Sequence, residues 1–111
     1  MEYRELGRTG WKVSSIGVRT WAIGSLLGPV SDDESLATLN RALDLGVSCF
    51  DTSDAYGSEP LLGQLRRQRR ELFYIATKTG MGVNPNARGY NRRNVTAFAE
   101  NSPRNLGIAG S

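Results

Sequence analysis

Two short apolar runs in this chain each end abruptly in a single ionisable residue. The run from Val47 to Phe50 is followed by Asp51, and the run from Leu72 to Thr77 is followed by Lys78. Helical patterns alternate with these runs, and such alternation is typical of a parallel sheet. Parallel α/β proteins keep their chemistry at the carboxyl ends of the strands. The sequence therefore predicts an α/β fold whose site contains Asp51 and Lys78.

Periodicity and turn residues indicate the remaining elements. Ser31 and Glu34 stand three residues apart, which is the signature of a helix start, and Gly46 is a natural helix stop. Interior-type apolar residues recur at helical spacing in two later segments. The expected elements are a hairpin over residues 3–13 with its turn at 7–10, a strand over 13–18, helices over about 31–46, 59–69 and 91–106, and a loop over 80–89.

Asp51, Tyr56 and Lys78 make a chemically sensible group. Tyrosine is a weak acid, with an ordinary pKa of about 10, and a nearby ammonium group lowers that pKa. A carboxylate beside the lysine keeps it charged and fixes its direction. Such a group suits proton transfer to a carbonyl oxygen. From spacing alone, the equal alternative is an Asp–Lys ion pair at the rim of the sheet, with Tyr56 as a packed loop aromatic.

Six short motifs occur along the chain in one order: Tyr3 to Gly10, Thr20 to Gly24, Phe50 to Thr52, Tyr56 to Glu59, Leu62-Gly63 and Ala76 to Lys78. The ordered set resembles the N-terminal part of the aldo-keto reductases, which are NADPH-dependent carbonyl reductases built on a (β/α)8 TIM barrel. The resemblance runs from residue 1 to about residue 107. It implies one partial domain over residues 1–111, an incomplete barrel made of a hairpin and three strand–helix units, with residues 107–111 as a disordered tail.

The resemblance also implies roles for individual residues. Asp51, Tyr56 and Lys78 would be catalytic, while Thr20, Trp21 and Asp51 would contact NADPH, and no metal is implied. The substrate would be a small aldehyde or ketone. The family also uses a histidine after the next strand and binds the adenosine phosphate with the second half of its barrel. This chain contains no histidine, so we expect activity to be impaired or absent in this fragment.

Three residues or segments depart from the family pattern. Arg19 replaces a glycine, and we expect it to obstruct the barrel mouth or to turn into solvent, with pairing to a cofactor phosphate as the alternative. The loop Tyr56 to Glu59 is shorter than usual, which would displace Tyr56. Pro103 interrupts the last expected helix, where it removes a hydrogen bond and clashes one turn back.

Composition narrows the class of protein. The net charge of +3 is mild, and the arginines between residues 66 and 70 are interpreted as a solvated helix end rather than as a nucleic-acid site. No apolar stretch is long enough for a membrane span. The lone Cys49 cannot form an internal disulfide, which favours a cytoplasmic protein. We therefore expect neither nucleic acid nor membrane as a partner.

A second hypothesis is a non-catalytic assembly module. An incomplete barrel would expose sheet edges and apolar faces, and self-association would cover them. The residues after Gly107 offer no apolar run for a fourth strand. A truncation, a frameshifted end and a gene remnant all remain compatible with such a C-terminus.

Overall fold

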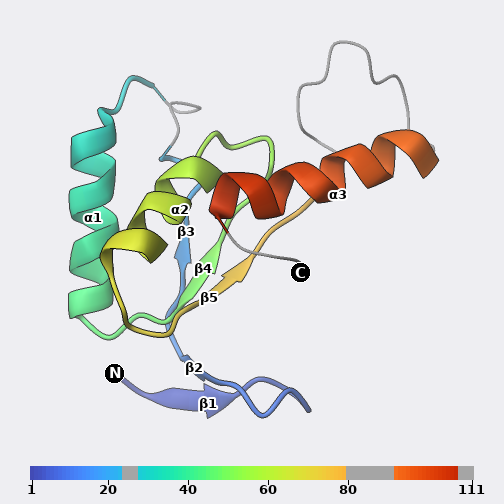
Figure 1. The fold of residues 1–111 in the computed structure, drawn as a ribbon. Helices are drawn as coiled ribbons and strands as arrows, with labels where there is room; N and C mark the ends of the chain where they lie inside the picture. The colour runs from blue at the N-terminus through green and yellow to red at the C-terminus, as the bar shows by residue number, and fades with distance from the viewer. Residues whose placement is uncertain (24–27, 80–91, 108–111) are drawn as a thin grey trace.

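The computed structural model describes residues 1–23, 28–79 and 92–107 (Figure 1). The predicted loop over 80–89 and residues 108–111 of the predicted tail over 107–111 lie outside these residues. The described elements are β1 (Tyr3–Glu5), β2 (Lys12–Ser14), β3 (Val18–Arg19), α1 (Asp32–Asp44), β4 (Cys49–Asp51), α2 (Glu59–Gln68), β5 (Tyr74–Ala76) and α3 (Arg92–Leu106). A hairpin followed by strand–helix units confirms the predicted α/β class and partial barrel.

The central sheet is parallel, with the strand order β3-β4-β5. Its register places Arg19 beside Asp51, and Asp51 beside Ala76. All three strands therefore end at the same edge, and Lys78 follows two residues beyond it. This arrangement confirms the prediction that Asp51 and the segment carrying Lys78 share one edge of the sheet.

The core lies between the sheet and its helices. Phe50 projects from the middle of β4 into a cluster with leucines of α1 and α2, and its ring meets Phe73 edge to face, with centroids 5.4 Å apart. α2 contacts α1 on one side and α3 on the other (Figure 1). The buried cluster consists of Leu39, Ala42, Leu43, Val47, Phe50, Leu61, Leu62, Leu65, Phe73 and Leu106.

α1 begins and ends where the sequence predicts. The Ser31 hydroxyl accepts a hydrogen bond from the Glu34 backbone N–H at 3.1 Å, which satisfies one of the amide groups left unpaired at a helix start. Gly46 follows the C-terminal cap with a φ of 91°, a conformation that favours glycine. Within the described segments, no helix combines the length and apolar character needed to cross a membrane.

The N-terminal hairpin covers the amino ends of the parallel strands, opposite Asp51 (Figure 1). Ser14 and Ser48 each donate a backbone N–H to the hydroxyl of the other at 2.9 Å. The Tyr3 hydroxyl donates to the Gly46 carbonyl at 2.8 Å. Trp11 stacks on Tyr74, with ring centroids 4.8 Å apart. These contacts fix the hairpin to the end of the sheet that lies away from the candidate site.

Several strand boundaries predicted from the sequence are wrong, and β4, for example, spans Cys49–Asp51 rather than residues 47–50. Val13 belongs to the hairpin, and the parallel strand begins only at Val18, because the Ser14 hydroxyl bonds to the Ile16 carbonyl and the chain bends there. The third strand begins at Tyr74 rather than at Leu72, whose side chain is 70% exposed. Leu72 is therefore an apolar residue at the rim of the sheet and not part of the buried strand.

The spacing of Val95, Phe98, Ala99 and Leu106 predicts one apolar face for α3. Leu106 is buried, as this pattern predicts, whereas Ala99 is exposed. The side chains of Val95 and Phe98, expected on the same face, lie outside the described set. Only the C-terminal part of this helix therefore supplies described core contacts.

Candidate active site

Four polar or charged side chains meet at the carboxyl edge of the sheet. Arg19 ends β3, Asp51 ends β4, and Lys78 follows β5, while Tyr56 lies in the loop between β4 and α2. The parallel register brings the three strand ends together although they are far apart in sequence. The residues predicted as catalytic therefore gather in one place, and Arg19 joins them.

Asp51 and Lys78 form a two-pronged ion pair. The Lys78 Nζ donates to Asp51 Oδ1 at 2.8 Å and to Oδ2 at 2.9 Å, and a third bond runs to the Thr52 carbonyl at 2.9 Å. With three acceptors, the ammonium group is held in one direction. The two side chains are 44% and 39% exposed, so the pair remains accessible from the barrel mouth.

Tyr56 lies beside this pair in spite of the short loop. The Lys78 Nζ is 5.3 Å from the centroid of the tyrosine ring. The phenolic oxygen accepts a hydrogen bond from the Arg19 guanidinium at 2.9 Å. This hydrogen bond from Arg19 lowers the pKa of Tyr56 below its ordinary value; burial opposes the shift, and the charges of Arg19 and Lys78 assist it.

Arg19 makes a contact that the sequence did not indicate. Its guanidinium donates a hydrogen bond to the Tyr56 hydroxyl, while the expectation that it obstructs the mouth or turns into solvent stays a prediction. Its Nε also lies 3.6 Å from Asp51 Oδ2, although the side chain stays 64% exposed. The signal that identifies it is the register, because residues 19 and 51 are neighbours on adjacent strands and therefore point to the same face.

A buried hydroxyl network supports the site from below. The Thr20 side chain is fully buried; its hydroxyl bonds to the Ser58 hydroxyl at 2.8 Å and to the Asp51 carbonyl at 3.2 Å. Ser58 also pairs with the Thr52 hydroxyl at 2.9 Å. The network ties β3, the end of β4 and the start of α2 together. Sequence reasoning assigned no role to Ser58 or Thr52, although both lie within motifs that identify the family, because the contacts of their hydroxyls depend on the packing of separate segments.

Trp21 and Asp51 are the exposed members of the set expected to contact a cofactor. The Trp21 side chain is 46% exposed one residue after the buried Thr20. An exposed indole offers a flat apolar surface, and the Asp51 carboxylate offers a hydrogen-bond acceptor. Within the described residues, no group of three or more His, Cys, Asp or Glu side chains is placed to hold a metal ion.

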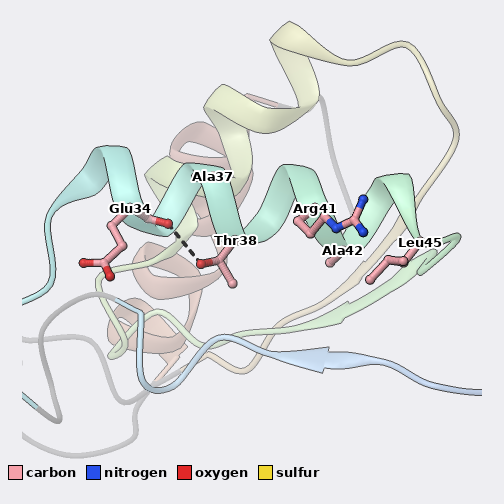
Figure 2. Close-up of a pocket in the computed structure, with 6 residues that line it drawn as sticks. All are labelled: Glu34, Ala37, Thr38, Arg41, Ala42 and Leu45. Atoms are coloured by element: carbon pink, nitrogen blue, oxygen red, sulfur yellow. Dashed lines mark hydrogen bonds between the residues drawn. The ribbon is translucent and has the colours of Figure 1, made fainter.

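A separate hollow lies on the outer side of α1 (Figure 2). It is lined by Glu34, Ala37, Thr38, Arg41, Ala42 and Leu45. The Thr38 hydroxyl is used within the helix, where it donates to the Glu34 carbonyl at 3.0 Å. The hollow contains none of the residues of the site at the sheet edge.

Comparison with known proteins gives one consistent answer. The model of the Aldo/keto reductase family matches residues 15–109. The chain is 42% identical over 86 residues to L-galactose dehydrogenase from Arabidopsis thaliana, covering 72% of this chain and 27% of that protein. It is 36% identical over 114 residues to aldo-keto reductase YhdN from Bacillus subtilis, covering 96% and 34%.

The fold has solved counterparts. The holo form of an aldo-keto reductase from Bacillus halodurans superimposes with a TM-score of 0.78 at 23% identity, over 97% of this chain and 37% of that one. The chain thus spans about a quarter to a third of the length of the curated relatives it matches. The region in common is the one that carries Arg19, Asp51, Tyr56 and Lys78.

Proposed function

Since this chain belongs to the aldo/keto reductase family, we propose that its sheet-edge site serves the reduction of a small aldehyde or ketone to an alcohol. The observation that carries the proposal is the position of Tyr56. A phenol with a lowered pKa stands beside a lysine that is held by three acceptors. That is the arrangement a proton donor to a carbonyl oxygen needs.

Each side chain has a defined part in this reaction. The O–H bond of Tyr56 breaks as the substrate carbonyl oxygen takes the proton, and a phenolate remains. Lys78 stabilises that phenolate by its charge, at 5.3 Å from the ring. Asp51 keeps the ammonium group in place through its two short contacts. The substrate oxygen would bind over Tyr56, where these charges favour its developing negative charge.

NADPH is the cofactor we propose, and bound NADPH would supply the hydride to the carbonyl carbon. The exposed Trp21 indole fits the flat nicotinamide ring, and the Asp51 carboxylate can accept a hydrogen bond from a sugar hydroxyl. Thr20 would contribute from beneath, since its buried hydroxyl fixes the backbone that carries Trp21. Because the chain spans a minor part of its relatives, we propose weak cofactor binding and impaired turnover for the chain alone.

Cofactor binding can be tested with the two tryptophans. In the proposal Trp21 contacts the cofactor, whereas Trp11 stacks on Tyr74 beside the amino ends of the strands. Titration with NADPH should quench the fluorescence of Trp11→Phe protein, which retains Trp21, and leave that of Trp21→Phe protein unchanged. Equal quenching in the two variants, or none in the protein that retains Trp21, would contradict the proposed position of the cofactor.

The chemical step needs its own measurement. Aldehyde reduction by the wild-type chain with NADPH should be slow but detectable, and Tyr56→Phe should abolish it, because phenylalanine keeps the ring and removes the proton. Tyr74→Phe is the matched control, since Tyr74 lies in β5 and stacks on the hairpin. A Tyr56→Phe variant as active as the wild type would show that Tyr56 is not the proton donor.

Self-association is a second candidate role, supported by the sheet edges. In the part of the chain that the structure describes, β3 and β5 each pair only with β4, so each has one edge without a strand partner. Such edges favour addition of another chain. Light scattering after size exclusion would separate the roles, because a concentration-independent monomer is incompatible with an assembly module.

We also propose that this protein is cytoplasmic, because its single cysteine, Cys49, is a free thiol.

A further inference from the structure

Arg19 occupies a position in the site that goes beyond the proposed roles of Asp51, Tyr56 and Lys78. We propose that Arg19 is a positioning residue for the proton donor, holding the Tyr56 oxygen by its acceptor side so that the O–H points to the substrate. This inference rests on the proposed function, but it concerns an atom pair that can be examined without turnover.

The contact itself is direct. The Arg19 guanidinium donates to the phenolic oxygen at 2.9 Å. A phenol has one O–H to donate and also accepts. Once Arg19 fills the acceptor side, the hydroxyl proton remains available for another acceptor. A carbonyl oxygen that approaches from the exposed mouth would be that acceptor.

Arg19 is itself held in place from a second side. Its Nε lies 3.6 Å from Asp51 Oδ2, and Lys78 donates to both oxygens of the same carboxylate. Asp51 therefore links the two cations that flank Tyr56. Asp54, the remaining carboxylate of the loop, accepts a bond from Ser53 at 3.3 Å. The charged groups whose contacts place them around the phenol are thus Arg19 and Lys78, with Asp51 bound to both, while Asp54 lies two residues before Tyr56 in the loop.

The geometry indicates which of the two cations has the stronger effect on the acidity of Tyr56. Arg19 bonds to the oxygen atom that gains the charge when Tyr56 ionises, whereas Lys78 lies over the ring, 5.3 Å from its centroid. A hydrogen bond to the charged form favours that form more than a charge at greater distance does. In agreement, Arg19 contributes more than Lys78 does to the lowered pKa of Tyr56. Arg19 should therefore control the acidity of the donor more strongly than the lysine does.

The experiment is a tyrosinate absorbance titration of the whole chain. The signal of Tyr56 is isolated by subtracting the titration of Tyr56→Phe. Arg19→Met should move the Tyr56 midpoint to higher pH, and by more than Lys78→Met does. Arg19→Lys keeps a cation and should restore part of the shift. Arg4→Met removes an exposed arginine of the hairpin and should leave the midpoint where it was.

Far-ultraviolet circular dichroism confirms that each variant is folded before it is titrated. A midpoint unchanged in Arg19→Met, or a smaller shift than in Lys78→Met, overturns the inference. Because the titration needs neither cofactor nor substrate, its result stands even if aldehyde reduction is not observed. Conversely, an active chain with an unmoved midpoint would support the proposed function and reject the role of Arg19.

Discussion

Gly63 of α2 lies so close to the backbone of Asn105 in α3 that no side chain fits between them. A Cβ atom at position 63 would lie 2.5 Å from the Asn105 carbonyl oxygen and 3.1 Å from the Leu106 carbonyl carbon. Backbone atoms cannot swing aside as the end of a flexible side chain can. The close packing of α2 on α3 therefore depends on the absence of a side chain at this position.

Gly63→Ala should therefore destabilise the protein, although alanine is the better helix former. Helix propensity favours alanine by about 1 kcal/mol, while overpacking costs about 1–3 kcal/mol. We expect a lower free energy of unfolding in urea. Gln68→Ala, at the exposed end of the same helix, should change it little. A more stable Gly63→Ala protein would mean that α3 moves away from α2 at low cost.

Glu59 connects the helices to the segment that carries Lys78. Its side chain is 1% exposed, accepts from the Thr77 hydroxyl at 2.7 Å and accepts from the Asn105 amide at 3.1 Å. Glu59→Ala should cost about 1–3 kcal/mol, because the buried hydrogen bonds are lost. Glu100→Ala, an exposed glutamate of α3, should stay within about 0.5 kcal/mol of the wild type. Equal thermal midpoints for the two variants would refute the structural role of Glu59.

The sequence predicted those features that depend on local signals. The helix start at Ser31 follows from residues three apart, and the common edge of Asp51 and Lys78 follows from two apolar runs that each end in a charge. Both need only neighbouring residues and the rule that parallel strands end together. The motif order was specific enough to identify the family, which the comparison confirmed.

The features that the sequence did not predict depend on contacts between distant residues. Arg19 meets Tyr56 across 37 positions, and its direction depends on the register of a strand only two residues long. Glu59 meets Asn105 across 46 positions, which requires the placement of α3 on α2. Neither contact has a periodic or local signature, so no pattern along the chain could indicate it.

Low pH should weaken one ion-pair cluster beside α2. Arg69 donates to Glu71 at 2.7 Å and to Asp44 at 2.8 Å, and the bond from Arg69 lowers the pKa of Glu71 from 4.5 to about 2. Because the folded pKa lies below the unfolded one, the stabilisation is fully present above pH 4.5 and is lost as the pH falls towards 2.

Thermal melts of wild type and Glu71→Gln across this range would measure the effect. The difference between their midpoints should be constant above pH 4.5 and shrink below it. The cluster is partly exposed, so added salt should also reduce the difference. A difference that persists unchanged at the acid end of the range would show that Glu71 acts through packing rather than through its charge.

Pro103 should lower the stability of the protein, because it lies inside a helix. It lies inside α3, three residues before the helix ends at Leu106. Proline has no N–H, so the Ala99 carbonyl one turn earlier loses its helical donor, and the ring crowds that carbonyl. Pro103→Leu should restore the hydrogen bond and raise the free energy of unfolding by up to about 3 kcal/mol. Thermal melts would show this as a higher midpoint, with Arg104→Leu as the control for added apolar surface at the next position. An unchanged midpoint in Pro103→Leu would mean that the last turn is frayed and gains nothing from the additional bond.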